Sequence, residues 1–492
     1  MPGTRLNPFI GVLAAAVVLW TGAHVACGWT SGDEGWYLYA AREVLRGHLP
    51  YFDFFFTQGP FTPLLMAPAM VVAPTLWTAR VESALLFLLA MVLGAMWLRD
   101  ASGGPDSPKR KGPGDFSSIW WMLLFGLSAF VVYMCTLALT TVYELLAACL
   151  TLVLLQRERR GWAVVVAALA CAVRVSLAPW ALAVWLFAAW TAPAPRASRA
   201  LGLALVGAGL TVLAYAPFAV AAPERLWTGL FGYHLGGGRL AFSAERVWIF
   251  RRFFWTSWIT FCWPALAAIA AGYAATLRRI RWDRWDALLL GGALALTIVH
   301  SLPSTPYPKY QVTPNALLAL AASRRLAWVQ IRPLLFVPLL FVLLPWQFVY
   351  YQYAVGDLAW PPAPARHHAA GRMIAGLARG EPVLTFETLL AVEGGLRVPP
   401  GYEMGAFSLT VSWDDARARR VGTVTPAMVT ADLESARYRV LALHIDDLGL
   451  ASAEWRDRAA AAIERNYRQV AAIPRIGHYQ STLFVFIRRN GD

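Results

Sequence analysis

The sequence predicts an α-helical polytopic membrane protein with a small α/β domain outside the membrane at its C-terminus. Three observations predict this fold class. The 492 residues are 58% hydrophobic and only 15% charged, whereas a soluble domain carries about 25% charged residues. Apolar runs close to the ~20 residues needed to cross a bilayer recur up to residue 351. Arginines gather in the short gaps between these runs, as in loops that stay in the cytoplasm.

The formal net charge of +14 at pH 7 agrees with such a topology. An excess of basic over acidic residues can also indicate nucleic-acid binding, but these arginines flank apolar runs, so we expect no nucleic-acid partner. The five cysteines lie within or at the edges of apolar runs, without the spacing of a metal site or a disulfide framework. No motif fixes a cofactor, and the question of a divalent metal stays open.

We expect about eleven spans, the first of which enters from the cytoplasm at 8–27. The loop at 28–80 is too rich in Gly, Pro and charge to lie in lipid. Two short segments, 161–173 and 177–191, flank Arg174 and are typical of broken or re-entrant helices. The other expected spans are 81–98, 118–136, 138–155, 201–221, 254–277, 286–302, 313–323 and 333–351.

This organisation divides the chain into a transmembrane domain, 1–351, and a tail, 352–492. Short loops on the predicted inner side carry more Lys and Arg than the outer ones, and an odd number of spans then places the tail in the periplasm. The Arg- and Ala-rich composition is typical of a bacterium, so we expect a bacterial inner membrane. Within the tail, strands are expected at 381–385, 439–444, 470–473 and 482–488, and an amphipathic helix at 453–465.

The first outer loop carries the most informative polar residues. Asp33 and Glu34 come just after the first span, and Tyr37, Ala40–Ala41 and Val44–Leu45 follow at helical spacing. This spacing predicts a helix lying on the membrane surface. By residue type alone, the two carboxylates are explained as the acidic first turn of that helix, where the helix dipole favours negative charge.

The order of motifs in this loop resembles the membrane glycosyltransferases of the GT-C class. The most similar branch looks like the protein O-mannosyltransferases and the lipid A aminoarabinose transferases. The resemblance extends over the layout of residues 1–350 and is specific over about 30–63. The motifs that carry it are Asp33-Glu34, the helix with Tyr37 and Arg42, Gly47-x-x-Pro50-Tyr51-x-Asp53, and Gln58-Gly59-Pro60.

The resemblance implies an enzyme that transfers a hexose or pentose from a polyprenyl-phosphate carrier to a hydroxyl of a protein, lipid or glycan, at the outer face of the membrane. It also implies that Asp33 is the catalytic carboxylate, with Glu34 as its neighbour. The chemistry is consistent, because the acceptor needs a base and the departing phosphate needs cations. One carboxylate suffices for a single inverting displacement, whereas double displacement needs a second as nucleophile.

Glu144 lies in the expected hairpin of the spans 118–136 and 138–155. An ionisable residue inside an apolar stretch is a functional candidate, and the resemblance implies a supporting acid or a metal ligand here. The alternative, given equal weight, is a hydrogen-bonding group between two helices.

Arg174, Lys309 and Arg42 are the predicted contacts to the donor phosphate. Arginine grips a phosphate bidentately, and lysine binds it as a point charge. The alternative is that these cations extend to lipid headgroups. The remaining substrate-site candidates are Tyr37, Tyr51, Asp53, Gln58, Tyr310 and His234, although a flexible connector is the favoured interpretation of the loop that carries His234.

Two other functions are compatible with such a chain. A transporter or lipid-carrier flippase would show paired inverted halves and polar groups near the bilayer midplane, whereas the acids here gather in outer loops. A non-catalytic assembly or sensory protein would use the spans as an anchor and the tail to bind a partner.

Overall fold

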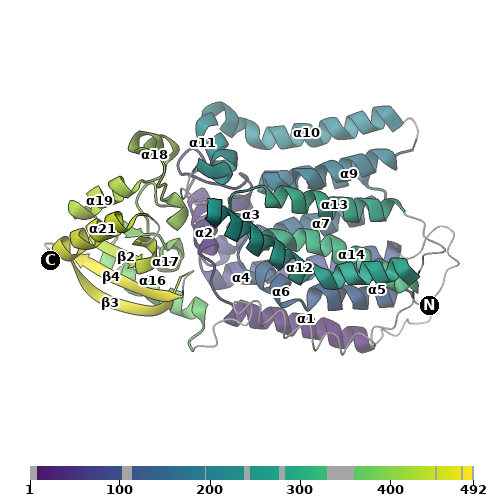
Figure 1. Cartoon of the computed structure of the whole chain (residues 1–492), viewed down its shortest axis with the longest axis horizontal. Coiled ribbons are helices and arrows are strands. Elements are labelled where there is room, and N and C mark those ends of the chain that lie inside the picture. The colour runs from purple at the N-terminus through teal and green to yellow at the C-terminus, as the bar shows by residue number, and fades with distance from the viewer. Residues whose placement is uncertain are drawn as a thin grey trace.

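The computed structural model describes residues 8–101, 113–193, 196–237, 244–275, 283–329, 360–448, 451–477 and 480–489. Residues up to 329 form a bundle of long helices, and residues from 360 onward pack as a sheet with helices against one end of that bundle (Figure 1). We call this end of the bundle the tail-facing end and the opposite one the far end. The first helix begins at the far end and finishes at the tail-facing end.

The bundle helices are apolar along most of their length, and the largest side chains of its interior, Trp97, Trp120, Trp121 and Trp180, are fully buried. The helices of the bundle are α1 Pro8–Cys27, α4 Leu76–Ala101, α5 Pro113–Trp121, the π-helix η1 Met122–Gly126, α6 Ala129–Thr136, α7 Thr141–Gln156, α8 Arg160–Val173, α9 Ala178–Trp190, α10 Arg196–Ala221, α12 Ala244–Ala275, α13 Arg284–Ser301 and α14 Val312–Val329.

Four helices in the described part of the chain, α1, α4, α10 and α12, are long and apolar enough to cross a membrane. A fifth crossing results if α5 with η1 and α6, which meet at a bend of 73°, count as one span. Helices α7, α8 and α9 are apolar but shorter. The prediction of about eleven spans therefore stays a prediction, and its last span, 333–351, lies outside the described residues.

Helices occupy the other expected spans, with end points within a few residues for most of them. The expected interruption at Arg174 is confirmed, since α8 ends at Val173 and the short 3-10 helix η2, Val175–Leu177, precedes α9. The bend between Gly126 and Ala129 was not predicted, because the run 118–136 is apolar throughout. Apolar composition reports burial and does not report a change of helix direction.

Short helices cover the tail-facing end of the bundle. A helix is present where the surface helix was expected, as α2 Gly32–Leu45, but it is buried from Asp33 to Glu43 and covered by the tail, so its placement on a membrane surface is not borne out. A second helix in the same loop, α3 Thr62–Val72, was not predicted. Its apolar residues Leu64, Val71 and Val72 are more than half exposed. The remaining short elements at this end are α11 Pro223–Trp227, the π-helix η3 Thr228–Gly237 and the 3-10 helix η4 Pro308–Gln311.

The tail contains a four-stranded mixed sheet in the order β1-β2-β4-β3. Strand β2 is buried at every residue and pairs in parallel with β1 and antiparallel with β4, which in turn pairs antiparallel with β3. All five elements expected in the tail are present. The tail elements are β1 Val383–Thr385, β2 Val440–His444, β3 Tyr467–Ile476, β4 Ser481–Arg488, α16 Ala363–Ala378, α17 Thr388–Gly394, η7 Gly405–Ser408, α18 Asp415–Val421, α19 Pro426–Glu434, α20 Ile445–Leu448 and α21 Ala453–Asn466.

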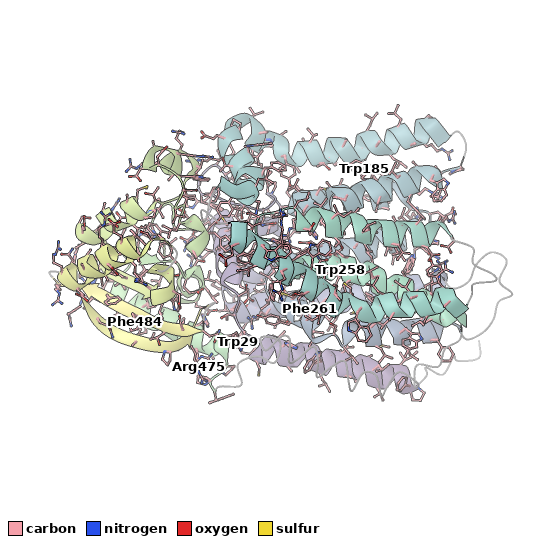
Figure 2. All side chains as sticks on the ribbon, in the orientation of Figure 1. Trp29, Trp185, Trp258, Phe261, Arg475 and Phe484 are labelled. Atoms are coloured by element: carbon pink, nitrogen blue, oxygen red, sulfur yellow. The ribbon has the colours of Figure 1, made fainter. Side chains whose placement is uncertain are left out.

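The tail contacts the bundle at several places, two of which lie next to the start and the middle of α2. After α1, the hydroxyl of Thr30 donates to the carbonyl of Gly477 over 3.4 Å, and Figure 2 labels the neighbouring Trp29 and Arg475 at this junction. Helix α17 packs on α2, where a Cβ added to Gly35 would lie 2.5 Å from the backbone nitrogen of Leu389. The tail thus rests on the helix that carries Asp33.

Candidate functional site

Helix α2 starts with a capping box that fixes both acids. The Ser31 hydroxyl accepts the N–H of Asp33 at 3.3 Å, and the Glu34 carboxylate accepts the N–H of Ser31 at 2.9 Å. Arg80 of α4 donates two bonds to Glu34, at 2.9 and 2.8 Å, and the N–H of Ala138 donates a third at 3.0 Å. Glu34 is fully buried in this arrangement. Through these hydrogen bonds Glu34 connects α2 to the bundle, so Asp33 is the acid of the pair that remains available for other partners.

Asp33 forms an ion pair with Lys309 of η4 and accepts the indole N–H of Trp36 at 3.2 Å. Both charged side chains are mostly buried, with 10% and 17% of their surfaces exposed. Opposite charges at this range attract each other strongly in a site of low polarity. The structure therefore brings together the predicted base and one predicted phosphate contact, from positions 276 residues apart.

Arg174 and Glu144 form a second ion pair beside the first. The guanidinium of Arg174, at the end of α8, donates to the Glu144 carboxylate of α7 at 2.9 Å and lies 3.5 Å from the Thr140 hydroxyl. It also lies over the ring of Tyr310, 4.0 Å from the centroid, as in a cation–π contact. Both charged side chains are less than 10% exposed.

We call Asp33, Lys309, Arg174 and Glu144 the four-charge cluster. Tyr310 joins its two halves, because the Lys309 ammonium lies 5.7 Å from the same ring. Burial raises the pKa of Tyr310 to about 12 and also raises that of the neighbouring Tyr37, so both hydroxyls stay protonated at neutral pH. Two acids and two cations, delivered by α2, α7, α8 and η4, meet at the tail-facing end of the bundle (Figure 1).

The Gln58-Gly59-Pro60 turn is packed against the end of α8. The N–H of Gly59 donates to the Val173 carbonyl at 3.0 Å, and that of Phe61 donates to the Ala172 carbonyl at 3.1 Å. A Cβ added to Gly59 would lie 2.0 Å from the Ala172 oxygen, so only glycine permits this approach. The turn that carries part of the resemblance therefore fixes the residues directly before Arg174.

Two further candidates contact this turn or the residue before it. Tyr51 is buried, and its hydroxyl donates to the carbonyl of Gln58. His234 of η3 lies with its Nε2 3.1 Å from the Thr57 carbonyl, and burial lowers the pKa of His234, which favours the neutral ring as donor. The chain around His234 is thus hydrogen-bonded at the site end of the bundle and is not a free connector.

Two predicted residues lie outside the cluster. Arg42 donates to the carbonyls of Ala391, at 2.7 Å, and Leu396, so its guanidinium is used by the tail, and we do not retain it as a phosphate contact. Asp53 accepts the N–H of Leu49 at 2.7 Å within its own exposed turn. Long cationic side chains and loop acids cannot be assigned from sequence, because their reach depends on which segment packs beside them.

Sequence reasoning missed Arg80, the partner of Glu34, and His300 of α13. His300 lies 3.1 Å from the Ser176 hydroxyl, with its ring 5.6 Å from that of Tyr310. Both lie in or beside apolar runs, where an ionisable residue is itself a signal of function or of a buried partner. For a metal, Glu144 offers a carboxylate already bonded to Arg174, and in the described part of the chain no three His, Cys, Asp or Glu residues gather as ligands.

The chain was compared with known proteins. No protein-family model matches it, and no curated protein matches it significantly. Among solved structures, ArnT from Cupriavidus metallidurans in the apo state is similar, with a TM-score of 0.64 and 16% identity over 97% of this chain and 98% of that one. The structure of the same protein bound to undecaprenyl phosphate is similar with a TM-score of 0.62 and 16% identity, over 99% of each chain.

Arabinosyltransferase EmbB from Mycobacterium smegmatis aligns with 86% of this chain and 44% of its own, at 15% identity and a TM-score of 0.43, which is too low to support an argument. The likeness to ArnT concerns the fold and extends along nearly the whole chain, tail included. It confirms the resemblance predicted from the first outer loop: this chain has the fold of the GT-C membrane glycosyltransferases, in the form that ArnT shows.

Proposed function

We propose that this protein is a GT-C-type glycosyltransferase that moves a sugar from a polyprenyl-phosphate carrier to an acceptor hydroxyl. The observation that carries the proposal is the four-charge cluster, in which two carboxylates and two cations, each with less than a fifth of its side chain exposed, meet at one end of an apolar bundle. The ArnT fold supports it, since one ArnT structure is bound to undecaprenyl phosphate.

The cluster suggests how donor binding activates the base. Without donor, each cation is neutralised by an acid, Lys309 by Asp33 and Arg174 by Glu144. A donor phosphate competes for both cations, and the buried site makes that competition strong because water is scarce. When the ammonium of Lys309 turns to the phosphate, the basicity of Asp33 rises, since its stabilising cation has moved away. Glu144 continues to orient Arg174.

The transfer is then a single displacement. The acceptor oxygen bonds to the anomeric carbon while the bond from that carbon to the phosphate oxygen breaks, and the electron pair leaves with the phosphate. Asp33 accepts the proton of the acceptor hydroxyl, and Lys309 and Arg174 stabilise the negative charge that develops on the leaving phosphate. Attack opposite the leaving group inverts the anomeric configuration.

The lipid part of the donor has an apolar surface at the same end of the bundle. Helix α3 exposes Leu64, Val71 and Val72, and α11 exposes Trp227 at 63%. Both helices lie at the tail-facing end (Figure 1). Exposed apolar and aromatic side chains at this depth are typical of a membrane interface, so a carrier can keep its isoprenoid chain in lipid while its phosphate reaches the cluster.

We place the protein in a bacterial inner membrane, with the cluster and the tail on the periplasmic side. The support is the distribution of cations, because the far end carries Arg157, Arg159, Arg199 and Arg284 near helix ends. Residues 352–492 then form a periplasmic α/β domain that covers α2. An acceptor would approach from that side.

The test is sugar transfer from radiolabelled undecaprenyl-phosphate sugars in proteoliposomes, with membrane extract as the source of acceptor. Asp33→Asn should reduce transfer at least about 100-fold, the usual contribution of a general base. Asp53→Asn is the matched control, because it removes the same charge from an exposed turn outside the cluster. Wild-type transfer by Asp33→Asn would refute the role of Asp33, and donor crossing the bilayer without covalent transfer would favour a flippase.

A further inference from the structure

A groove with a volume of about 720 Å³ lies at the far end of the bundle, opposite the four-charge cluster. It runs between the first turns of α8 and α10, and the end of α9 closes it. Arg159, Arg160 and Arg199 are at its polar side, and Trp162, Leu203 and Val206 form its apolar wall. The groove thus combines a basic end with an apolar side.

The apolar wall faces outward from the protein. Helix α10 lies at the periphery of the bundle, since only 11% of its apolar membrane-spanning stretch is buried. Trp162 and Val206 are 64% and 47% exposed. At Gly161 and Gly202, which also line the groove, an added Cβ would meet nothing within 4 Å. In a membrane this wall contacts acyl chains, because the neighbouring helices leave it uncovered.

The length of α8 explains why cations are found there. A helix of 14 residues is about 21 Å long, shorter than the roughly 30 Å hydrocarbon core of a bilayer. One of its ends must therefore lie at hydrocarbon depth or draw polar groups inward. At the cluster end, Arg174 is covered by Glu144 and Tyr310. At the groove end, Arg160 donates to the Thr191 hydroxyl at 3.2 Å, and Arg199 donates to the Pro193 carbonyl at 3.3 Å.

We propose that this groove binds one anionic phospholipid of the far leaflet, with its phosphate on the three arginines and an acyl chain along the apolar wall. The charge favours an anion, because the single acid of the lining, Glu158, is 77% exposed and 3.8 Å from Arg160. The outward apolar wall favours a ligand with a hydrocarbon chain over free phosphate. Basic pockets between membrane helices bind acidic lipid headgroups in this way.

The bound lipid would sit on the same helix as Arg174, about 20 Å along α8 from it. This inference does not rest on the proposed function, since the groove lies at the other end of the bundle and its test measures lipid binding only.

The experiment is native mass spectrometry of delipidated, full-length protein titrated with phosphatidylglycerol or phosphatidylcholine. The wild type should retain phosphatidylglycerol in preference to phosphatidylcholine. The variant Arg159→Gln/Arg160→Gln/Arg199→Gln should lose on the order of 100-fold in affinity, at about fivefold per arginine. The matched control, Arg99→Gln/Arg157→Gln/Arg284→Gln, removes as much charge from the same end outside the groove and should bind as the wild type does.

Gly202→Phe tests the apolar wall separately, because it fills open space and leaves every charge in place. It should weaken phosphatidylglycerol binding while the protein stays monodisperse. Equal retention of the two lipids by the wild type, or equal loss in the groove and control triples, would overturn the proposal. Selective retention of undecaprenyl phosphate over phosphatidylglycerol, lost in the groove triple and kept in the control triple, would overturn the assignment of the ligand.

Discussion

Glu144 and Arg174 allow a decisive test of whether the four-charge cluster is a site or only a structural ion pair. Both side chains are buried, 2.9 Å apart. Removing one partner leaves an uncompensated buried charge, so Glu144→Gln and Arg174→Gln should each destabilise the protein by about 3–5 kcal/mol. The double variant leaves no charge behind, so it should be more stable than the two single effects predict, by about 2 kcal/mol or more.

Activity should follow a different pattern from stability. The double variant regains stability but lacks the guanidinium that holds the donor phosphate, so its kcat/KM should fall roughly 10- to 100-fold, the usual value of one charged hydrogen bond. Thermal unfolding in detergent measures the stability, and sugar transfer in proteoliposomes measures kcat/KM. A stable double variant with wild-type kcat/KM would refute the catalytic role of the pair.

A buried pair at the far end supplies the control. Asp286 and Arg325 form an ion pair with 0% and 3% of their side chains exposed. Asp286→Asn/Arg325→Gln should show a non-additive effect on stability of the same sign. The effect should be smaller, because Arg324 also lies 3.3 Å from Asp286 and keeps its ion pair with Asp283. Transfer by this variant should match the wild type, because the pair lies at the end of the bundle away from Asp33.

Three further predictions concern packing and pH. Gly59→Ala forces a side chain onto the Ala172 carbonyl and should reduce transfer at least about tenfold by displacing Arg174, whereas Gly22→Ala, with nothing within 4 Å, should be silent. Gly35→Ala should loosen the contact of α17 with α2, seen as faster hydrogen exchange at 388–394, and Gly376→Ala, in open space on α16, should not. Burial raises the pKa of Glu403 to about 7 from its ordinary 4.5, so the folded state binds more protons than the unfolded one in this window and stability falls as pH rises through it. Glu403→Gln should therefore become more stable than the wild type above pH 7, on the order of 2 kcal/mol by thermal unfolding.

These predictions fail in recognisable ways. Wild-type transfer by Gly59→Ala would show that the loop can move without disturbing Arg174. Unchanged exchange in Gly35→Ala would show that α17 does not depend on α2. A stability difference between Glu403→Gln and wild type that stays constant from pH 5 to 8 would exclude titration of Glu403 in this range.

Much of the fold could be predicted because hydrophobic periodicity reports burial directly. The ends of α1, the break at Arg174 and the tail strands follow from apolar runs and the residues that interrupt them. Helix α3 was missed because its Pro68 and the glycines nearby indicate a loop, although a proline in a short helix at an interface is tolerated.

The site could be predicted only in part. Asp33 was selected by the resemblance to the GT-C class, and Arg174 and Lys309 were selected as cations near apolar runs; the structure places the three together. The partner of each charged side chain could not be predicted. Glu34 pairs with Arg80, and Arg42 donates to a carbonyl of the tail, and both contacts join segments far apart in the chain. Pairing is a property of tertiary packing, and no local pattern encodes it.

The contact of α17 with α2 has a consequence for the order of assembly. Arg42 and the Ala391 carbonyl that it binds are 349 positions apart. The ribosome therefore makes the helix that bears Asp33 well before the tail segment that covers it. Until that tail has folded, α2 lacks a wall against which Gly35 packs. A nascent or truncated chain without the tail then carries an incomplete tail-facing end, so the surroundings of Asp33 are finished only after the tail is made.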